Sequence, residues 1–488
     1  MYFSEDLRIY NLFPDLVGSM SKWHHYVKQA ADMGFTAFWI NPFWATGEAP
    51  NDQGQSGSNY AIKTPGVLDK KFSNNESPER NRGEFPPEII IERDLTDIKE
   101  FTAIIKDHGM RPIADLVLNH LSLCSPVVNG KDPRYPGSEN WFRRTPDGKI
   151  DHDRTTRTVW SDVAPFDFNT TDLTIREKII EFLKSQVDLY IDCGFTAFRC
   201  DAPGKIPTDI WKNIISHASQ RINAPIFIAE TVGVPWDWHQ NLEGVGFSHT
   251  VNSVYYTHPL VEGRVKSGRP DGETDWFDKE LASLKRIAPS IGFPCYHDSR
   301  HGRFMYIMEN IYGSSNKILL ERENRMQYAK AALLSDGVFM PIGFEGGYRN
   351  PLNVFTTSTA SQETDSINLR PFISEINTLR EKSLDRWPLN SQFKENRVCL
   401  THNSLLIIVR YNENSPLPGR VMFVNLHPEK SINISEITNS TNKIAQKLAE
   451  KNIAVAFKQN IEEISQNTAL AELQKAHRIT KCYDGLAR

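Results

Sequence analysis

The chain lacks the features that mark several common protein classes. Its 488 residues hold only six cysteines and no Cys-x-x-Cys pair, so buried free thiols are expected rather than disulfides or a zinc site. No Gly-x-Gly-x-x-Gly motif follows the first predicted strand, which disfavours dinucleotide binding. No run reaches the roughly eighteen apolar residues of a membrane helix. The formal charge of −4 disfavours a nucleic-acid partner.

The N-terminus also lacks a recognisable export signal. Its first residues show neither the basic region nor the apolar region of a secretory signal peptide. We therefore expect a cytoplasmic protein, or one exported without a classical signal peptide. The composition, with 39% hydrophobic and 24% charged residues, is typical of a globular protein. The length suits one large barrel with a smaller appended domain.

Short β-rich runs alternate with longer amphipathic segments over most of the chain, which is typical of βα units around a parallel sheet. Two predicted helices end at a glycine directly before the next strand, at Gly34 and Gly194. Repeated helix–glycine–strand units favour an α/β fold of the (β/α)8 TIM-barrel type over an open sheet. The predicted strands cover residues 8–13, 37–41, 111–118, 197–200, 226–229, 290–295 and 338–341, and the predicted helices cover 23–33, 97–108, 173–193 and 207–221.

Two segments depart from this alternation. Residues 121–169 are rich in Pro, Gly, Asp, Arg and Trp and are too long for an ordinary βα loop, so they predict a subdomain inserted after the third strand. Residues 385–488 predict a small β-rich C-terminal domain with a polar tail. The catalytic barrel is then expected at residues 1–120 and 170–384. Within the last domain, 397–411 and 420–426 are β-rich and 461–476 are helix-like.

Four acidic residues stand at or near the ends of β-rich runs: Asp115, Asp201, Glu230 and Asp298. In a parallel barrel these ends converge on one mouth. Each acid alone is explained equally well by a strand-end cap or a buried ion pair. All four together, in barrel order, favour catalysis. A retaining glycosyl transfer needs such a set, because one carboxylate attacks the anomeric carbon while a second carboxylic acid protonates the leaving oxygen.

The motifs around these acids resemble those of glycoside hydrolase family 13, the α-amylase family. Asp-Leu-Val-Leu-Asn-His, Phe-Arg-x-Asp-Ala and Ala-Glu occur in that order, and the resemblance covers about residues 5–350. It implies a retaining α-glucan hydrolase or transglycosylase that acts on α-1,4-linked glucosides through a covalent intermediate on Asp201. Glu230 is then the general acid/base and Asp298 the transition-state carboxylate. The substrate-binding residues implied are Tyr60, Asp115, His120, Arg199 and His297.

Several of these side chains have a structural alternative. Arg199 should project from the same strand face as Asp201, where it would orient the nucleophile or simply form a barrel-lining ion pair. Tyr60 would stack on a sugar or pack as a buried loop tyrosine. Tryptophans in predicted loops suit stacking on pyranose rings. They are Trp141, Trp160, Trp236 and Trp238, and packing of the inserted subdomain is the alternative for the first two.

The sequence also departs from the family pattern. Tyr296 stands where an asparagine commonly precedes the His-Asp pair, and Lys205 follows Asp201 without the usual Lys-His pair, so the acceptor site is expected to be rebuilt. Asn119 matches a position that helps to bind calcium in many family members. Calcium wants six or more oxygen ligands, and no others can be identified. No cofactor is required by the chemistry, and calcium binding stays open.

Pro203 and residues 140–149 are similar to one branch of the family, the glucan maltosyltransferases that use maltose 1-phosphate. This alternative needs a phosphate site, for which Arg143, Arg144 and Lys149 are candidates. A catalytically silent glycan-binding barrel is disfavoured by the retained acids. A metal-dependent hydrolase is disfavoured because Asn119-His120 is the one tempting ligand pair. The expected partner is an α-glucan or maltooligosaccharide.

Overall fold

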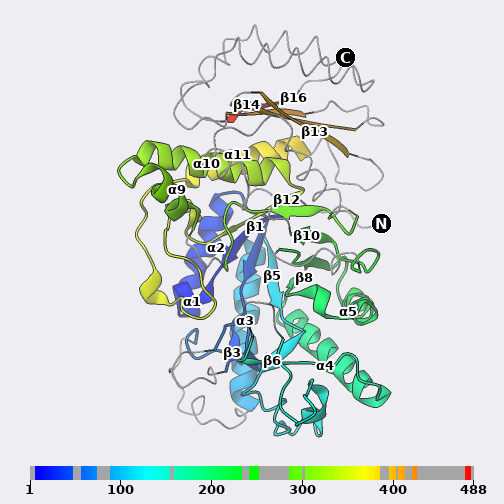
Figure 1. Cartoon of the computed structure of the whole chain (residues 1–488). Coiled ribbons are helices and arrows are strands. Elements are labelled where there is room, and N and C mark those ends of the chain that lie inside the picture. Colours follow the sequence, from blue (N-terminus) through cyan, green and yellow to red (C-terminus); the bar gives the residue numbers. More distant parts are fainter. Residues whose placement is uncertain are drawn as a thin grey trace.

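Eight parallel strands close into a barrel in a computed structural model of the chain (Figure 1). This confirms the predicted (β/α)8 architecture. The strands, in barrel order, are β1 (Arg8–Leu12), β2 (Ala37–Ile40), β5 (Arg111–Leu116), β8 (Ala197–Cys200), β9 (Ile226–Ala229), β10 (His249–Val251), β11 (Ser290–Gly292) and β12 (Gly337–Pro341). The structure describes residues 6–47, 57–73, 88–153, 159–232, 241–251, 284, 286–298, 303–384, 395–402, 405–412, 420–425 and 479–484.

Amphipathic helices surround the barrel, and α4 shows why these segments are helical. It begins after Asp172, whose carboxylate accepts hydrogen bonds from the backbone amides of Thr174 and Ile175. Its buried residues include Ile179, Leu183 and Val187, which recur at helical spacing. The helices described around the barrel are α1 (Pro14–Val17), α2 (Trp23–Asp32), α3 (Glu88–Asp107), α4 (Leu173–Asp192), α5 (Thr208–Arg221), α9 (Phe304–Tyr312), α10 (Lys317–Leu334) and α11 (Arg370–Leu384).

The two predicted glycine caps are confirmed. Gly34 and Gly194 have φ values of 78° and 91°, in the left-handed region that favours glycine. Their amides donate to the carbonyls of Ala31 and Ile191 at 2.9 Å and 2.8 Å. A Cβ atom at Gly194 would lie 2.6 Å from the hydroxyl of Thr102. Each glycine therefore turns the chain from a helix into the next strand, β2 or β8.

Alternating residues of the barrel strands point into its interior. Ile226 and Ile228 belong to the inner apolar cluster, while Phe227 between them packs in the outer cluster against the helices. Ala197 is also an inner residue, so Arg199 two positions later faces inward as well. The inner cluster comprises Leu7, Ile9, Ala37, Trp39, Ile113, Ala197, Ile226, Ile228, Val251, Ile291, Phe293 and Phe339.

Some elements differ from the expectations. The sequence did not predict β10, which has only three residues, two of them polar, nor α9, α10 and α11. The β-rich run at 397–411 forms two paired antiparallel strands. Residues 461–476 lie outside the described residues. The four-stranded sheet after α11 consists of β13 (Glu395–His402), β14 (Leu405–Asn412), β15 (Arg420–Asn425) and β16 (Ile479–Asp484).

The described parts of residues 121–169 contain little regular structure, and the limits of this predicted subdomain stay a prediction. The N-terminal part of the chain has one further antiparallel pair, and the segment 120–165 has another. Within the described ranges, no helix is both long and apolar enough to cross a membrane. These additional elements are β3 (Trp44–Thr46), β4 (Ile62–Leu68), β6 (His120–Ser122), β7 (Val163–Pro165) and the 3-10 turn η3 (Ser138–Trp141).

The cysteines only partly follow the prediction. Cys193, Cys200 and Cys295 are free and buried, whereas Cys124 is free and exposed. The expectation of a buried thiol is therefore wrong for Cys124. It lies in a turn just beyond β6.

One inward-facing histidine makes the fold sensitive to acid. His249 in β10 is fully buried, and neither ring nitrogen has a hydrogen-bond partner among the described residues. Burial lowers its pKa from 6.5 to about 4. The unfolded chain therefore takes up a proton on this ring between about pH 6.5 and pH 4 while the folded chain does not. Stability is lost across that window as the pH falls.

We expect His249→Leu to flatten this pH dependence. The free energy of unfolding of the natural protein should fall by up to about 3 kcal/mol more between pH 7 and pH 4 than that of the variant. Urea unfolding at a series of pH values measures both curves. Leucine is a suitable replacement because the imidazole of His249 makes no hydrogen bond among the described residues that the substitution would remove. Parallel curves for the two proteins would show that His249 does not titrate differently on unfolding.

Candidate active site

Three of the predicted acids lie at one edge of the barrel because their strands are neighbours. Asp115 in β5 pairs laterally with Arg199 in β8, and β8 pairs with β9 in the same way. The amide of Asp201 donates to the carbonyl of Leu116 at 3.0 Å, and that of Glu230 donates to the carbonyl of Cys200 at 3.2 Å. The parallel ladder thus continues through both catalytic candidates and fixes their backbones side by side.

Arg199 joins the three acids. Its Nη1 lies 2.8 Å from Asp115 Oδ1 and 3.1 Å from Asp201 Oδ1, and its Nη2 lies 2.5 Å from Glu230 Oε1. The side chain is almost fully buried. Burial alone would lower its pKa, but Asp115 and Glu230 outweigh it and raise the pKa of Arg199 well above its usual value. One permanent cation is therefore shared by three carboxylates.

Asp115 accepts hydrogen bonds from three side chains besides Arg199. Trp39 Nε1 donates to its Oδ2 at 3.2 Å, Asn41 Nδ2 at 3.3 Å and the Tyr60 hydroxyl at 2.8 Å. Burial raises the pKa of Asp115 to about 7, although Arg199 opposes the shift. Sequence reasoning missed Trp39 and Asn41 as site residues. Their signal was their place at the end of β2, two residues apart and so on one strand face.

Tyr60 connects Asp115 to the two predicted histidines. Its hydroxyl lies 3.0 Å from His297 Nε2, and its carbonyl lies 3.2 Å from His120 Nε2. Burial lowers the pKa of His120 to about 4, and burial together with Arg199 lowers that of His297 well below 6.5. Both rings are therefore neutral near pH 7. The predicted residues His120 and His297 thus both contact Tyr60, whose side chain is half-buried.

Glu230 has three donors on its two oxygens. The amide of Ala202 donates to Oε2 at 3.1 Å, and the Tyr296 hydroxyl donates to Oε1, which also contacts Arg199. Ala202 has a φ of 39°, a left-handed conformation rarely adopted by residues other than glycine. Burial raises the pKa of Glu230 despite the opposing effect of Arg199. A carboxyl group with a raised pKa suits a general acid.

Asp201 is positioned on its second oxygen by Asn119. Asn119 Nδ2 donates to Asp201 Oδ2 at 3.4 Å, while its own Oδ1 is buried without a hydrogen-bond partner among the described residues. The described residues hold no group of three or more His, Cys, Asp or Glu side chains that could bind a metal ion. One unpartnered oxygen is far short of the six or more that calcium requires. Asn119 alone does not make a calcium site, and calcium binding stays a prediction.

The remaining predictions have mixed outcomes. Asp298 is exposed and directly follows the buried His297. Trp141 is buried against Tyr135 and Phe182, as the packing alternative expects. Trp160 is half-buried, with Lys205 Nζ 4.5 Å from its ring centroid. Trp236 and Trp238 lie outside the described residues.

The three cationic residues proposed for a phosphate site are all engaged within their own segment. Arg143 lies 2.9 Å from Asp153 Oδ1 and donates to the carbonyl of Asp151. Arg144 donates to the carbonyls of Gly148 and Glu139. Lys149 is largely exposed and lies 2.9 Å from Asp147. A phosphate would have to displace these partners, so the arrangement gives no ready-made site.

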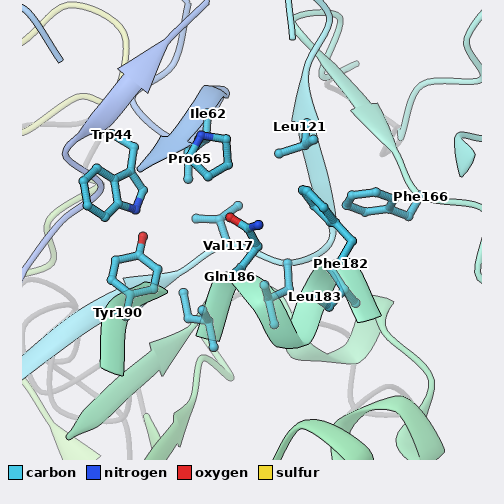
Figure 2. Close-up of a pocket in the computed structure, with 12 residues that line it drawn as sticks. Trp44, Ile62, Pro65, Val117, Leu121, Phe166, Phe182, Leu183, Gln186 and Tyr190 are labelled. Carbon is cyan, nitrogen blue, oxygen red and sulfur yellow. The ribbon is translucent and has the colours of Figure 1, made fainter. Parts of the chain in front are cut away.

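Behind the strand that carries Asp115 lies a separate, mostly apolar cavity (Figure 2). The side chains of Trp44, Val117 and Phe182 are among its walls. Gln186 supplies one of its few polar groups. Sugars need several hydrogen bonds for each ring, so this cavity does not match the expected substrate, and the acid cluster stays the candidate site.

Comparisons in sequence point to one group of enzymes. No protein-family model matches the chain. The chain is 24% identical over 389 residues to an α-1,4-glucan:maltose-1-phosphate maltosyltransferase of Methylacidiphilum infernorum, a match that covers 77% of this chain and 52% of that protein. It is 30% identical over 156 residues to the enzyme of the same name from Bifidobacterium longum, covering 32% and 19%. The chain thus spans about half of the first relative and less of the second.

Comparisons in structure identify the fold. An α-amylase of Geobacillus thermoleovorans has a TM-score of 0.61 at 15% identity, over 87% of this chain and 88% of that one. A cyclic α-maltosyl-(1→6)-maltose hydrolase of Arthrobacter globiformis has a TM-score of 0.58 at 15% identity, over 86% and 91%. The resemblance to the α-amylase family is confirmed. Against the pattern of the α-amylase family, Tyr296 is the departure that touches the acid cluster directly.

Proposed function

We propose that the protein is a retaining α-glucan hydrolase or transglycosylase that acts on α-1,4-linked glucosides through a covalent glycosyl-enzyme on Asp201. The observation that carries this proposal is the pairing of Asp201 and Glu230 on neighbouring strand ends. Both are held by the same buried cation, Arg199. The two carboxyl groups have different surroundings, which suits a nucleophile and a proton donor in one mouth.

In the first step, a carboxylate oxygen of Asp201 attacks the anomeric carbon as the bond from that carbon to the leaving oxygen breaks. The proton on Glu230 passes to the leaving oxygen, so Glu230 becomes a carboxylate. Arg199 and Asn119 contact one oxygen of Asp201 each, which orients the nucleophile. The raised pKa of Glu230 favours the protonated form, which donates this proton.

In the second step, the ionised Glu230 takes a proton from water or from a sugar hydroxyl. The oxygen of that group attacks the anomeric carbon and displaces Asp201, which regenerates both carboxyl groups. Neutral His120 and His297 and the hydroxyl of Tyr60 would hold hydroxyl groups of the sugar in the mouth. We assign Asp298 to the third carboxylate on its place directly after His297.

Whether water or a sugar receives the glycosyl group depends on the residues at the acceptor side of the barrel mouth. Lys205, four residues after Asp201, lies 2.8 Å from Asp153 and covers the ring of Trp160. An indole and an ammonium at this edge suit a sugar acceptor, since a pyranose offers both apolar faces and hydroxyl groups. We therefore place the acceptor beside Trp160 and Lys205.

A second candidate is a maltosyltransferase with maltose 1-phosphate as donor, which the printed names of the relatives favour. Incubation with maltoheptaose and with maltose 1-phosphate plus maltoheptaose separates the two. We expect shorter and longer oligosaccharides, or new reducing ends, from maltoheptaose alone. Phosphate release without any product from maltoheptaose alone would establish the second candidate instead. A protein inactive on both mixtures would support the silent glycan-binding barrel.

A further inference from the structure

Tyr296 is fixed against the end of the barrel by other rings. Its ring centroid lies 4.4 Å from that of His297, 5.1 Å from that of Phe293 and 6.1 Å from that of Phe339. Phe293 and Phe339 belong to the inner apolar cluster. Packing therefore fixes the position of the Tyr296 ring, and its hydroxyl donates a hydrogen bond to Glu230 at the barrel mouth.

The three groups that donate hydrogen bonds to Glu230 differ in whether they can also accept one. The Ala202 amide and the Arg199 guanidinium can only donate hydrogen bonds. The Tyr296 hydroxyl can both donate and accept, and it already accepts from Arg199 Nη2 at 3.4 Å. Glu230 must alternate between a carboxylic acid and a carboxylate during a retaining reaction. Of these three partners, only the phenol can both donate to the carboxylate and accept a hydrogen bond from the protonated acid.

We propose that Tyr296 is a positioning residue for the acid/base Glu230, which it keeps in place in both protonation states. The inference rests on the proposed function, because it assigns Glu230 a proton-transfer role. The phenol reaches Glu230 from the position where an asparagine is common in the α-amylase family.

The other charged and titratable groups around Glu230 come from two directions. Arg199 and Asp201 face it from the end of β8, and Tyr60 acts on it from the segment between β3 and β4. All three remain when Tyr296 is changed. The hydrogen bond from Tyr296 lowers the pKa of Glu230, so its removal raises that pKa. The basic limb of the pH profile, where the acid loses its proton, then moves to higher pH.

Tyr296→Phe tests the proposal, because phenylalanine keeps the ring packing and removes only the hydroxyl. Two donors are compared: maltooligosaccharides, whose leaving sugar needs a proton, and α-maltosyl fluoride, whose leaving fluoride needs little proton assistance. We expect kcat/KM to fall about tenfold or more on the oligosaccharide and less than about twofold on the fluoride. The basic limb on the oligosaccharide should move upward.

Tyr328→Phe is the matched control, since it also removes one buried phenol hydroxyl. That hydroxyl donates to Asn377 Oδ1 at 2.8 Å, away from the acid cluster. Its pH profile and the ratio of its rates on the two donors should equal those of the natural protein. If Tyr296→Phe yields no folded protein, Tyr296→Leu, which also lacks the hydroxyl, carries the same comparison.

Two outcomes are clearly separated. Equal losses on both donors with an unmoved basic limb would overturn the role of Tyr296 and leave a merely structural tyrosine. A natural protein that acts on neither donor would instead overturn the proposed function, before any variant is compared.

Discussion

Turnover of α-glucans should fall by about 10⁴-fold or more in Asp201→Asn, the scale on which enzymes lose activity when a residue of the catalytic unit is removed. An amide is too weak a nucleophile to form the glycosyl-enzyme, so the first step stops. Asparagine has nearly the size of aspartate and can keep its place between Arg199 and Asn119. Product formation from maltoheptaose, followed by chromatography, measures the loss.

Asp209→Asn is the matched control for this prediction. Asp209 lies in α5 on the outside of the barrel, where its half-exposed carboxylate pairs with Arg176 at 2.7 Å. The same chemical change there should leave turnover within about twofold. Trapping the intermediate adds a direct readout, because a fluorinated glycosyl fluoride should label the natural protein and not Asp201→Asn. Labelling of another carboxylate would reassign the nucleophile.

Arg199→Met should lower the free energy of unfolding by about 3–5 kcal/mol, the usual cost of removing one partner from a buried ion pair. Methionine fills much of the volume but leaves Asp115, Asp201 and Glu230 without their shared cation. These carboxyl groups can respond by taking up protons. The loss of stability should therefore be smaller at pH 5 than at pH 8, and urea unfolding at the two pH values measures it.

An exposed arginine provides the comparison. Arg221 also contacts two carboxylates, those of Asp188 and Asp192, at 2.6 Å and 2.7 Å. It lies on the surface of α5, where water screens the charges, so Arg221→Met should cost at most about 1 kcal/mol. Equal losses of stability in the two variants would contradict the role of Arg199 as a buried cation shared by three acids.

The barrel and its two main acids were predictable because they follow from local patterns. Left-handed glycines after helices and β-rich runs that end in an acid are visible over a few residues, as at Gly194 and Asp201. The three-residue strand at His249 was not predictable, since so short a run has no period to detect. It is a strand because β9 and β11 flank it and pair with it.

The partners of the site residues were less visible than the residues themselves. Trp39 and Asn41 reach Asp115 because β2 and β5 pair in a register that no local pattern specifies. The sequence was equally uninformative about which charged side chains form ion pairs with each other. Arg143 suggested a phosphate site by its charge, but the fold places Asp153 beside it. Sequence shows which groups a segment carries, whereas only the folded chain shows which of them are already taken.

Among the described residues, three acids share the one guanidinium of Arg199, so this cluster favours positively charged ligands. Two of those acids, Asp115 and Glu230, have raised pKa values and so retain protons more readily than free carboxyl groups. A ligand that carries its own cation, such as a sugar analogue with a protonated ring nitrogen, would displace those protons on binding. Its affinity would then increase with pH for as long as the analogue stays charged, whereas a neutral sugar of the same shape would show no such dependence.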